Sequence, residues 1–395
     1  MADPASERYQ RKLTAAIDAA TSAFEIDILE IIAERLGSIE GMTIDELYAA
    51  MPDDILRIQR KIDKGAKGLE NLTEQIMSDM AKANDEWAGQ YYQAANVAQE
   101  SAMNHPAMSK VLEENTAGIK RKVSALCRSS VVGIGDGSTY EPVAEGYRRI
   151  VSSAATSMSR TEFKGANKNL TIDQAVARAI RRLSRDGLRV QYRSGVTRNL
   201  QTAVRTNVMD AFRSTVSELR EMQGREFGAD GVEVTAHALC APDHLPYQGM
   251  RYPYRPRPDY RYTWDEVQNM PARPLVTGAN CGHTVFPVII GVSEPAYSRD
   301  ELNELKRLSN EQITFEGLSG EDLTMSRYEA SQYQRKMETN IREFKKEAYL
   351  QQAANNGDPK PARKAARDLT QKYKDISEQM GLNPRPDLLR IYISK

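Results

Sequence analysis

The chain of 395 residues has little of several features that mark large classes of protein. It has three cysteines, and Cys127 is distant in sequence from the other two, which does not make a disulfide framework and fits a reducing compartment. No run approaches the roughly 20 apolar residues of a membrane-spanning helix. Residues 1–4 also lack the basic-then-apolar pattern of a signal peptide. We therefore expect a soluble protein, made in a cytoplasm, with no membrane partner.

The chain also has no net charge, but its charges are unevenly distributed. Residues 1–105 carry 19 acidic and 10 basic side chains, residues 106–225 carry 11 and 21, and the remaining residues carry 24 and 23. A basic middle third is a candidate surface for nucleic acid.

Six arginines lie within residues 178–193, where Asp186 is the only acidic residue. They are Arg178, Arg181, Arg182, Arg185, Arg189 and Arg193. Two interpretations stay open: a solvated helix face paired with acidic groups of the first third, or a surface that binds DNA phosphates. Because no base-reading motif accompanies these arginines, we expect such DNA binding to be independent of base sequence.

Histidine and cysteine are scarce, yet three of the four histidines and two of the three cysteines lie between residues 237 and 283. They form two clusters, His237-Ala-Leu-Cys240-Ala-Pro-Asp-His244 and Cys281-Gly-His283. A Cys-x3-His pair followed by a Cys-x-His pair supplies the four ligands that a tetrahedral zinc ion needs. The candidate zinc ligands are Cys240, His244, Cys281 and His283, with His237 as a further candidate.

Two other interpretations of the clusters stay open. The histidines could hydrogen-bond loop backbone while the thiols pack as small apolar groups, or a cysteine and a histidine could act together in nucleophilic catalysis. An alternating strand predicted over residues 232–235 leads into the first cluster, and the second leads into a strand predicted over 284–290. If these strands pair, the two clusters meet in one site. The proline-, tyrosine- and arginine-rich residues 246–274 between them have no regular period and predict a long loop pinned by Arg–aromatic contacts, with nucleobase stacking as the alternative.

Most of the remaining sequence has helical periodicity, so we expect an α+β protein that is predominantly α-helical. Its expected parts are a helical N-terminal domain (1–130), a glycine-rich linker (131–141), a small mixed α/β middle domain with the Cys/His clusters (142–297) and a helical C-terminal extension (298–395). The glycine-interrupted helix that begins at residue 53 is expected to need a packing partner, preferably from the same chain.

Local signals predict several helix ends. A helix opened by Thr43 is expected to end before Pro52, and Thr197 is expected to cap the next helix of the middle domain. Capping boxes are predicted for Thr43 with Glu46, Ser298 with Glu301, and Ser326 with Glu329. Two helices near the C-terminus are predicted to pair as a hairpin or to contact other chains, and residues 388–393 predict a short strand.

Three segments carry a family resemblance. They are Ala241-Pro-Asp-His-Leu-Pro-Tyr-Gln-Gly249, then Asn280-Cys-Gly-His283 running to Pro287 and Gly291-Val-Ser-Glu-Pro295, and finally Tyr328 to Glu338 with Ile341-Arg342. Over residues 195–380 the chain resembles the phage minor capsid protein 2 family, which is related to the Mu F-like head morphogenesis proteins. The resemblance implies that the middle domain is Mu F-like.

The same resemblance implies a structural function and no agreed reaction. The expected protein is a minor capsid or head morphogenesis component of a tailed phage, in the capsid interior or at the portal vertex, and in the host cytoplasm during assembly. Its expected partners are the portal or major capsid protein, and packaged double-stranded DNA. The alternatives are a zinc-dependent hydrolase or nuclease with Asp243 or Glu294 as base, and a sequence-independent DNA-binding protein.

Overall fold

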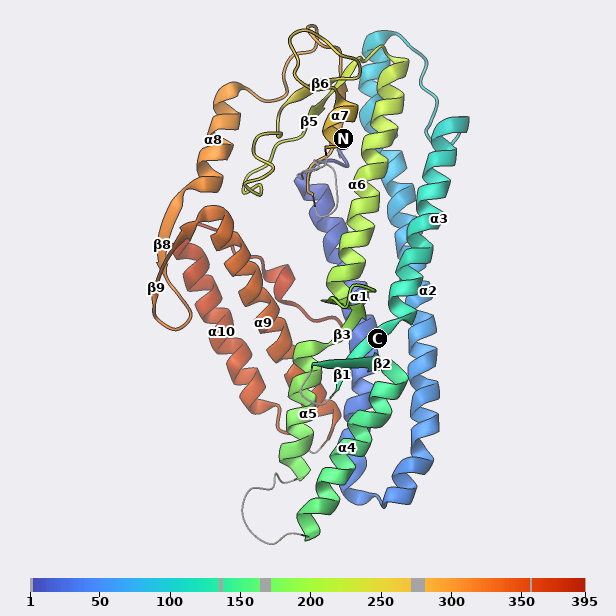
Figure 1. Ribbon diagram of the computed structural model, residues 1–395, viewed down its shortest axis with the longest axis vertical. Helices are drawn as coiled ribbons and strands as arrows, with labels where there is room; N and C mark the ends of the chain where they lie inside the picture. The colour runs from blue at the N-terminus through green and yellow to red at the C-terminus, as the bar shows by residue number, and fades with distance from the viewer. Residues whose placement is uncertain (1–2, 135–137, 164–171, 271–280, 356, 395) are drawn as a thin grey trace. The chain divides into compact units, whose positions relative to one another are not determined.

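The computed structural model describes residues 3–134, 138–163, 172–270, 281–355 and 357–394 (Figure 1). It is 64% helical with small antiparallel sheets, which confirms the predominantly helical α+β class. None of the described helices is long and apolar enough to cross a membrane.

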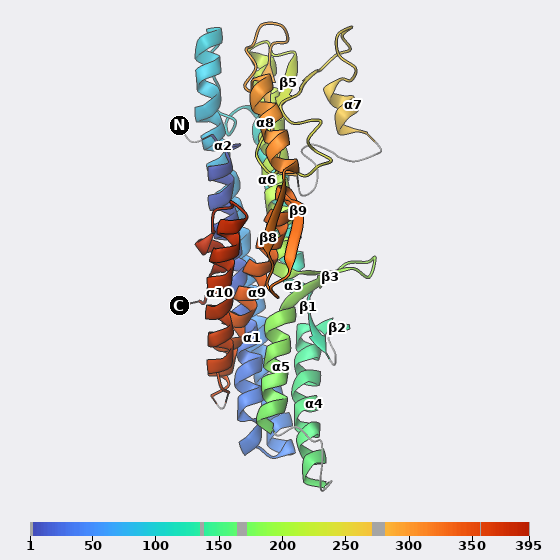
Figure 2. The ribbon, with the colours of Figure 1, turned by 90° about the vertical axis from the view of Figure 1, so that its left-hand side faces the viewer.

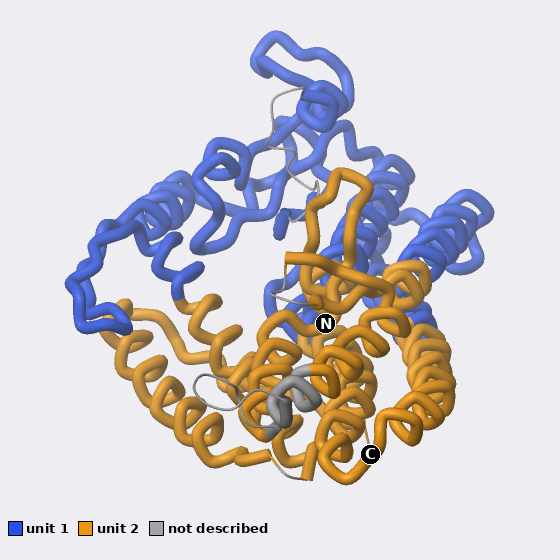
Figure 3. The backbone as a smooth tube through the Cα atoms, turned by 60° about the horizontal axis from the view of Figure 1, so that its bottom comes forward, with its two compact units in different colours: residues 1–14, 70–122, 205–333 blue, residues 15–69, 123–204, 334–395 orange. Residues whose placement is uncertain are grey.

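The chain forms two compact units, each built from three separate segments (Figure 3). Unit 1 comprises residues 1–14, 70–122 and 205–333, and unit 2 comprises residues 15–69, 123–204 and 334–395. The helices with residues in both units are α1 (Glu7–Ser38), α2 (Ile44–Ala95), α3 (Pro106–Arg128), α6 (Leu200–Glu226) and α9 (Arg327–Ala353). The segments of the two units alternate along the chain. The division into three consecutive domains that the sequence suggests stays a prediction.

Unit 2 contains a four-stranded antiparallel sheet in the order β2-β1-β3-β4. Its strands are β1 (Ser130–Ile134), β2 (Thr139–Pro142), β3 (Leu188–Gln191) and β4 (Thr197–Asn199). The remaining elements of the unit are α4 (Val143–Phe163), α5 (Ile172–Asp186), α10 (Lys360–Gln379) and the 3-10 helices Ile39–Gly41 and Pro386–Leu389.

The glycine-rich segment 131–141 is not the linker that was expected. Its two ends are strands β1 and β2, and residues 135–137 lie outside the described part. All five residues of β1 are buried, and β1 pairs with β3 as well as with β2. The burial of β1 and its pairing with a strand on each side therefore outweigh the flexibility that the alternating glycines suggest.

Gly65 marks a close contact between α2 and α1. A Cβ at Gly65 would lie 2.1 Å from a ring carbon of Phe24, whereas a Cβ at Gly68 would meet nothing within 4 Å. Phe24 is buried, so the absence of a side chain at position 65 makes room for its ring. This contact confirms that the glycine-interrupted helix packs against another segment of the same chain.

We expect Gly65→Ala to destabilise the protein by about 1–3 kcal/mol because the added methyl forces the Phe24 ring or the helices to move. The matched control is Gly68→Ala on the exposed side of the same helix, which we expect to stabilise it by roughly 0.5–1 kcal/mol. Thermal or denaturant unfolding of the two variants checks this difference. Equal stabilisation by both alanines would contradict the close contact.

Helix α2 does not end before Pro52, as the sequence predicted, but continues through it. A proline inside a helix costs about 3 kcal/mol. The adjoining turn is held by the buried Asp54 carboxylate, which accepts hydrogen bonds of 2.6 Å from Arg35 Nε and 2.6 Å from Tyr147 Oη. These contacts, together with the buried apolar stripe on both sides of Pro52, offset the cost.

Two further predictions about local structure are wrong. Thr197 does not cap α6, because it lies in β4, and the cap is Asn199, whose Oδ1 accepts from Thr202 N at 3.3 Å. Residues 388–393 form no strand. The backbone carbonyl groups of this segment accept hydrogen bonds from side chains of α9 instead. Arg342 donates to Leu388 O at 2.5 Å, and Lys345 donates to Leu389 O at 2.7 Å.

The helical hairpin of the C-terminal region is confirmed. Helices α9 and α10 lie side by side (Figure 1, Figure 2), and Gln334 donates to Ser377 Oγ at 3.0 Å between them. Tyr373 Oη donates to Glu338 Oε1 at 2.9 Å in the same interface.

Unit 1 contains a three-stranded antiparallel sheet in the order β6-β5-β7 and a separate hairpin of β8 and β9. The strands are β5 (Gly231–Val234), β6 (Arg251–Pro253), β7 (Val285–Val288), β8 (Gln312–Glu316) and β9 (Asp322–Ser326). Helices α7 (Trp264–Gln268) and α8 (Arg299–Asn310) complete the unit. The predicted capping boxes are present at the starts of α2, α8 and α9.

Candidate metal centre

The two strands that flank the Cys/His clusters pair directly. Strand β5 runs antiparallel to β7, with Val234 opposite Val285. Just beyond this pair, Thr235 N donates to Thr284 O at 2.9 Å, so the end of β5 lies beside the start of β7. The first cluster follows β5 and the second precedes β7, so the pairing brings both to the same end of the sheet.

A compact apolar core fixes this end of the sheet. Val232, Val234 and Val285 are fully buried against Trp264 and Cys281. Trp264 belongs to α7, inside the segment 246–274 that was expected to be an irregular loop. The capping box of Thr263 with Glu266, which that expectation missed, starts the helix.

Part of the expectation for this segment is confirmed. The guanidinium of Arg225 lies 4.9 Å from the ring centroid of Tyr254, and that of Arg261 lies 5.0 Å from the ring centroid of Tyr262. The segment is therefore pinned by Arg–aromatic contacts, as predicted. Residues 271–280, which include Asn280 of the sequence motif, lie outside the described part.

The Cys and His side chains of the two clusters converge. Cys281 Sγ lies 3.2 Å from His283 Nδ1 and 3.5 Å from His244 Nδ1. Cys240 Sγ lies 3.7 Å from His283 Nε2. Within the described residues, the ligand atoms form two groups of three that share His283: His237, Cys240 and His283, and His244, Cys281 and His283. In each group all ligand atoms lie within 4.8 Å of one another.

The two sulfur–nitrogen distances from Cys281 fit the edges of a zinc coordination tetrahedron. Zinc–sulfur bonds of about 2.3 Å and zinc–nitrogen bonds of about 2.0 Å put the two ligand atoms about 3.5 Å apart at the tetrahedral angle. The observed distances are 3.2 Å to His283 Nδ1 and 3.5 Å to His244 Nδ1, whereas the 3.7 Å distance from Cys240 ends on Nε2, the other nitrogen of His283. The donor set of thiols and imidazoles also suits zinc.

His283, the common member of both groups, is held in the neutral form. It is fully buried. Burial, followed by the positive charges of His237, His244 and Arg213, lowers the pKa of His283 to about 2. A neutral imidazole keeps the lone pair that a metal ion requires.

The two cysteines and His283 are buried, and His237 and His244 are half-buried. Cys240 and Cys281 are each 1% exposed. Burial, followed by the negative charges of Cys281 and Asp243, raises the pKa of the Cys240 thiol to about 12. A structural zinc site is closed, whereas a catalytic one keeps a position open for water. Asp243 and Glu294, the bases considered for a hydrolase, are both exposed side chains.

Comparison with known proteins decides the family. The family model described as phage minor capsid protein 2 matches residues 16–379, nearly the whole chain. The chain belongs to the phage minor capsid protein 2 family. No curated protein and no solved structure matches it. The minor capsid protein is thus a structural phage protein, and its family indicates a location in the virion.

The six arginines of the minor capsid protein are spread over α5, β3 and the turn after β3. The exposed ones are Arg178, Arg181, Arg185 and Arg193, and the half-buried ones are Arg182 and Arg189. Arg181 Nε lies 3.1 Å from Glu347 Oε1, so its acidic partner comes from α9 and not from residues 1–105. Arg189 donates to Thr197 Oγ1 at 3.2 Å and lies over the Tyr140 ring.

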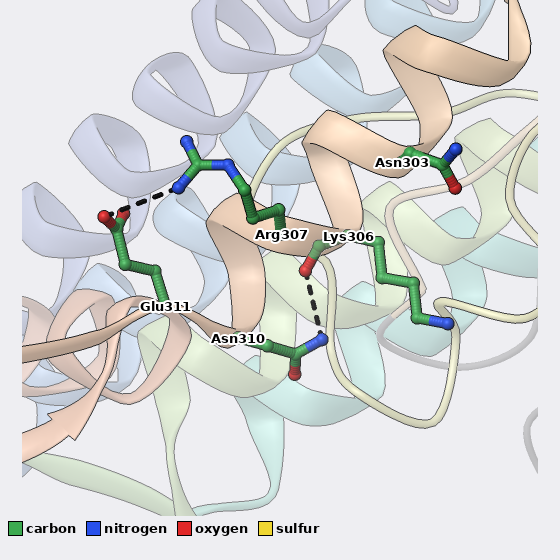
Figure 4. Close-up of a pocket in the computed structure, with 5 residues that line it drawn as sticks. All are labelled: Asn303, Lys306, Arg307, Asn310 and Glu311. Atoms are coloured by element: carbon green, nitrogen blue, oxygen red, sulfur yellow. Dashed lines mark hydrogen bonds and ion pairs between the residues drawn. The ribbon is translucent and has the colours of Figure 1, made fainter.

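A pocket of about 440 Å³ on α8 is not a comparable site (Figure 4). It is wide open, and its lining side chains interact with one another and with the backbone of α8. Arg307 lies 3.6 Å from Glu311, and Asn310 donates to Lys306 O at 3.0 Å. These contacts leave no converging set of polar groups for a ligand.

The minor capsid protein has a buried polar network in unit 1 that the sequence reasoning missed. Arg220 of α6 is fully buried, donates to Asn84 Oδ1 at 3.0 Å and pairs with Asp3. Its guanidinium lies 3.8 Å from the ring centroid of Trp87 and 3.5 Å from Val285 O at the start of β7. The sequence contains one signal for this burial: Arg220 follows Val216 by four residues, which places both on the buried side of α6.

Proposed function

We propose that this chain is an architectural component at or near the portal vertex of a tailed phage, with a structural zinc ion in its Cys/His cluster. The cluster of buried thiols and converging imidazoles is the observation that carries the metal. The location rests on membership of the minor capsid family. The proposed partners are the portal protein or the major capsid protein, reached during assembly in the host cytoplasm.

Zinc would be held by four side chains of the cluster, with Cys281, His244 and His283 as one group and a fourth ligand from the group beside it. The sequence assigns that fourth position to Cys240. Bound zinc supplies a rigid cross-link between the end of β5 and the start of β7. Such a cross-link anchors both ends of the long segment between the two clusters and so adds directly to folding free energy.

Elemental analysis of the purified full chain tests this metal centre. We expect one zinc per chain, retained through dialysis and removed by a strong chelator together with the protection of β5 and β7 amides from hydrogen exchange. A chain that folds fully with no bound metal, and takes up none when zinc is added, would contradict the proposal.

We also propose that the arginines on α5 and after β3 contact packaged DNA. Arg178, Arg185 and Arg193 are exposed. Exposed cations suit phosphate, and the contact would not depend on base sequence.

Replacing Arg178, Arg185 and Arg193 with glutamine is expected to reduce the slope of log affinity against log salt by about 0.9 per lost phosphate contact. Fluorescence anisotropy with a labelled duplex at several salt concentrations measures the slope. The matched control is Arg307→Gln on α8, where the arginine is paired with Glu304 and Glu311. A slope unchanged in the triple variant would remove DNA from the proposed function.

A further inference from the structure

His237 has the hydrogen-bonding pattern of a metal ligand. Its Nδ1 lies 3.1 Å from the carbonyl oxygen of Ala238, which fits an N–H donated to that oxygen. Its Nε2 is buried and has no hydrogen-bond partner among the described residues. Histidine ligands usually donate one ring N–H to a carbonyl or carboxylate and bind the metal through the other nitrogen. A buried imidazole nitrogen left without a partner otherwise costs stability.

The unpartnered nitrogen lies against the loop that carries the second cluster. A Cβ at Gly282 would lie 3.1 Å from His237 Nε2, so glycine at this position lets the backbone between Cys281 and His283 approach the ring closely. The ring of His237 is also stacked on that of His283, with centroids 4.4 Å apart. His237 therefore lies against the segment Cys281-Gly282-His283.

The candidate ligand atom of Cys240 has a hydrogen-bond partner, whereas Nε2 of His237 has none. Its thiol donates to the carbonyl oxygen of Ala241 at 3.3 Å. A protonated, hydrogen-bonded thiol in an apolar setting behaves as a small core side chain and needs no metal. Of the two side chains in this group that could supply the fourth ligand, only His237 presents a buried lone pair that nothing satisfies.

We propose that His237 binds the ion through Nε2, in the place that the sequence assigns to Cys240. The ligands are then His237, His244, Cys281 and His283, with the Cys240 thiol packed beside them. The inference rests on the proposed zinc centre and specifies its chemistry: one thiolate and three neutral imidazoles instead of two of each.

Cobalt(II) substitution tests this assignment, because the intensity of the thiolate-to-cobalt charge-transfer band follows the number of thiolate ligands. In the full chain, we expect Cys240→Ser to keep the band and to lower the affinity for cobalt by less than about 100-fold, the upper end of the range for a residue beside the ligands. His237→Ala should lower the affinity more than about 100-fold, because loss of a ligand exceeds loss of a supporting contact. The matched control is His105→Gln, the one histidine outside the cluster, which should bind as the wild type does.

His237→Cys provides a second variant that keeps the test decisive if the alanine variant folds poorly. We expect it to bind cobalt with a stronger charge-transfer band, because a second thiolate enters the coordination sphere. Loss of the band's intensity in Cys240→Ser, with wild-type binding by His237→Ala, would overturn the inference while leaving the zinc centre in place. A wild-type chain that binds neither cobalt nor zinc would remove the zinc centre and this inference together.

Discussion

Replacing Cys281 with serine is expected to abolish metal binding and to cause the largest local loss of stability of any substitution in the cluster. Cys281 contacts both His244 and His283, and it packs in the core formed by Val232, Val234 and Trp264. A ligand that binds only the folded state adds about 4 kcal/mol when its concentration is about 1,000 times its Kd. We therefore expect a loss of about that size in the free energy of opening β5 and β7.

Hydrogen exchange at the amides of β5 and β7, with and without a chelator, measures this loss. The chelator should weaken protection in the wild type and have no further effect on Cys281→Ser. The matched control is Cys127→Ala, a buried cysteine in unit 2, which should keep the chelator response. Cys281→Ser with wild-type protection and wild-type zinc content would show that the thiol only packs.

Replacing Arg220 with methionine is expected to destabilise unit 1 by about 1–3 kcal/mol, because it leaves a buried hydrogen-bond acceptor without its donor. The substitution leaves Asn84 without its donor and removes the cation from the face of Trp87. It also breaks the link from α6 to Val285, two residues after His283. The effect should therefore reach the metal centre as a weaker affinity for zinc.

Denaturant unfolding and a zinc titration of the same variant check both effects. Arg307→Met is the control, because its side chain is exposed on α8, and we expect no measurable change in stability or zinc affinity. An Arg220→Met variant as stable as the wild type would show that Asp3, Asn84 and Trp87 adapt without the guanidinium.

The sequence predicted the elements that carry the site because their signals are local. Alternation in Val232 and Val234, and the apolar run that includes Val285, are period-two patterns that specify strands with buried faces. The rarity of histidine and cysteine then marked the strand ends. The sequence alone did not decide whether the two strands pair, because strand register depends on packing between distant segments.

The sequence could not predict features that arise from tertiary contacts. Pro52 signals a helix end, yet Asp54 is held by Arg35 and Tyr147 from elsewhere in the chain. Glycines in 131–141 signal a loop, yet the flanking residues pair on two edges. The Sγ atom of Cys240 finds a backbone partner and the Nε2 atom of His237 does not, and spacing along the chain does not encode that difference.

Reconstruction of the portal vertex in purified particles of the encoding phage, by cryo-electron microscopy, tests the central claim most directly. We expect density for this chain beside the portal, with a metal peak between the end of β5 and the start of β7, and the arginines of α5 turned toward DNA. Particles that lack the chain, or that carry it away from the portal vertex with no metal peak, would contradict the account.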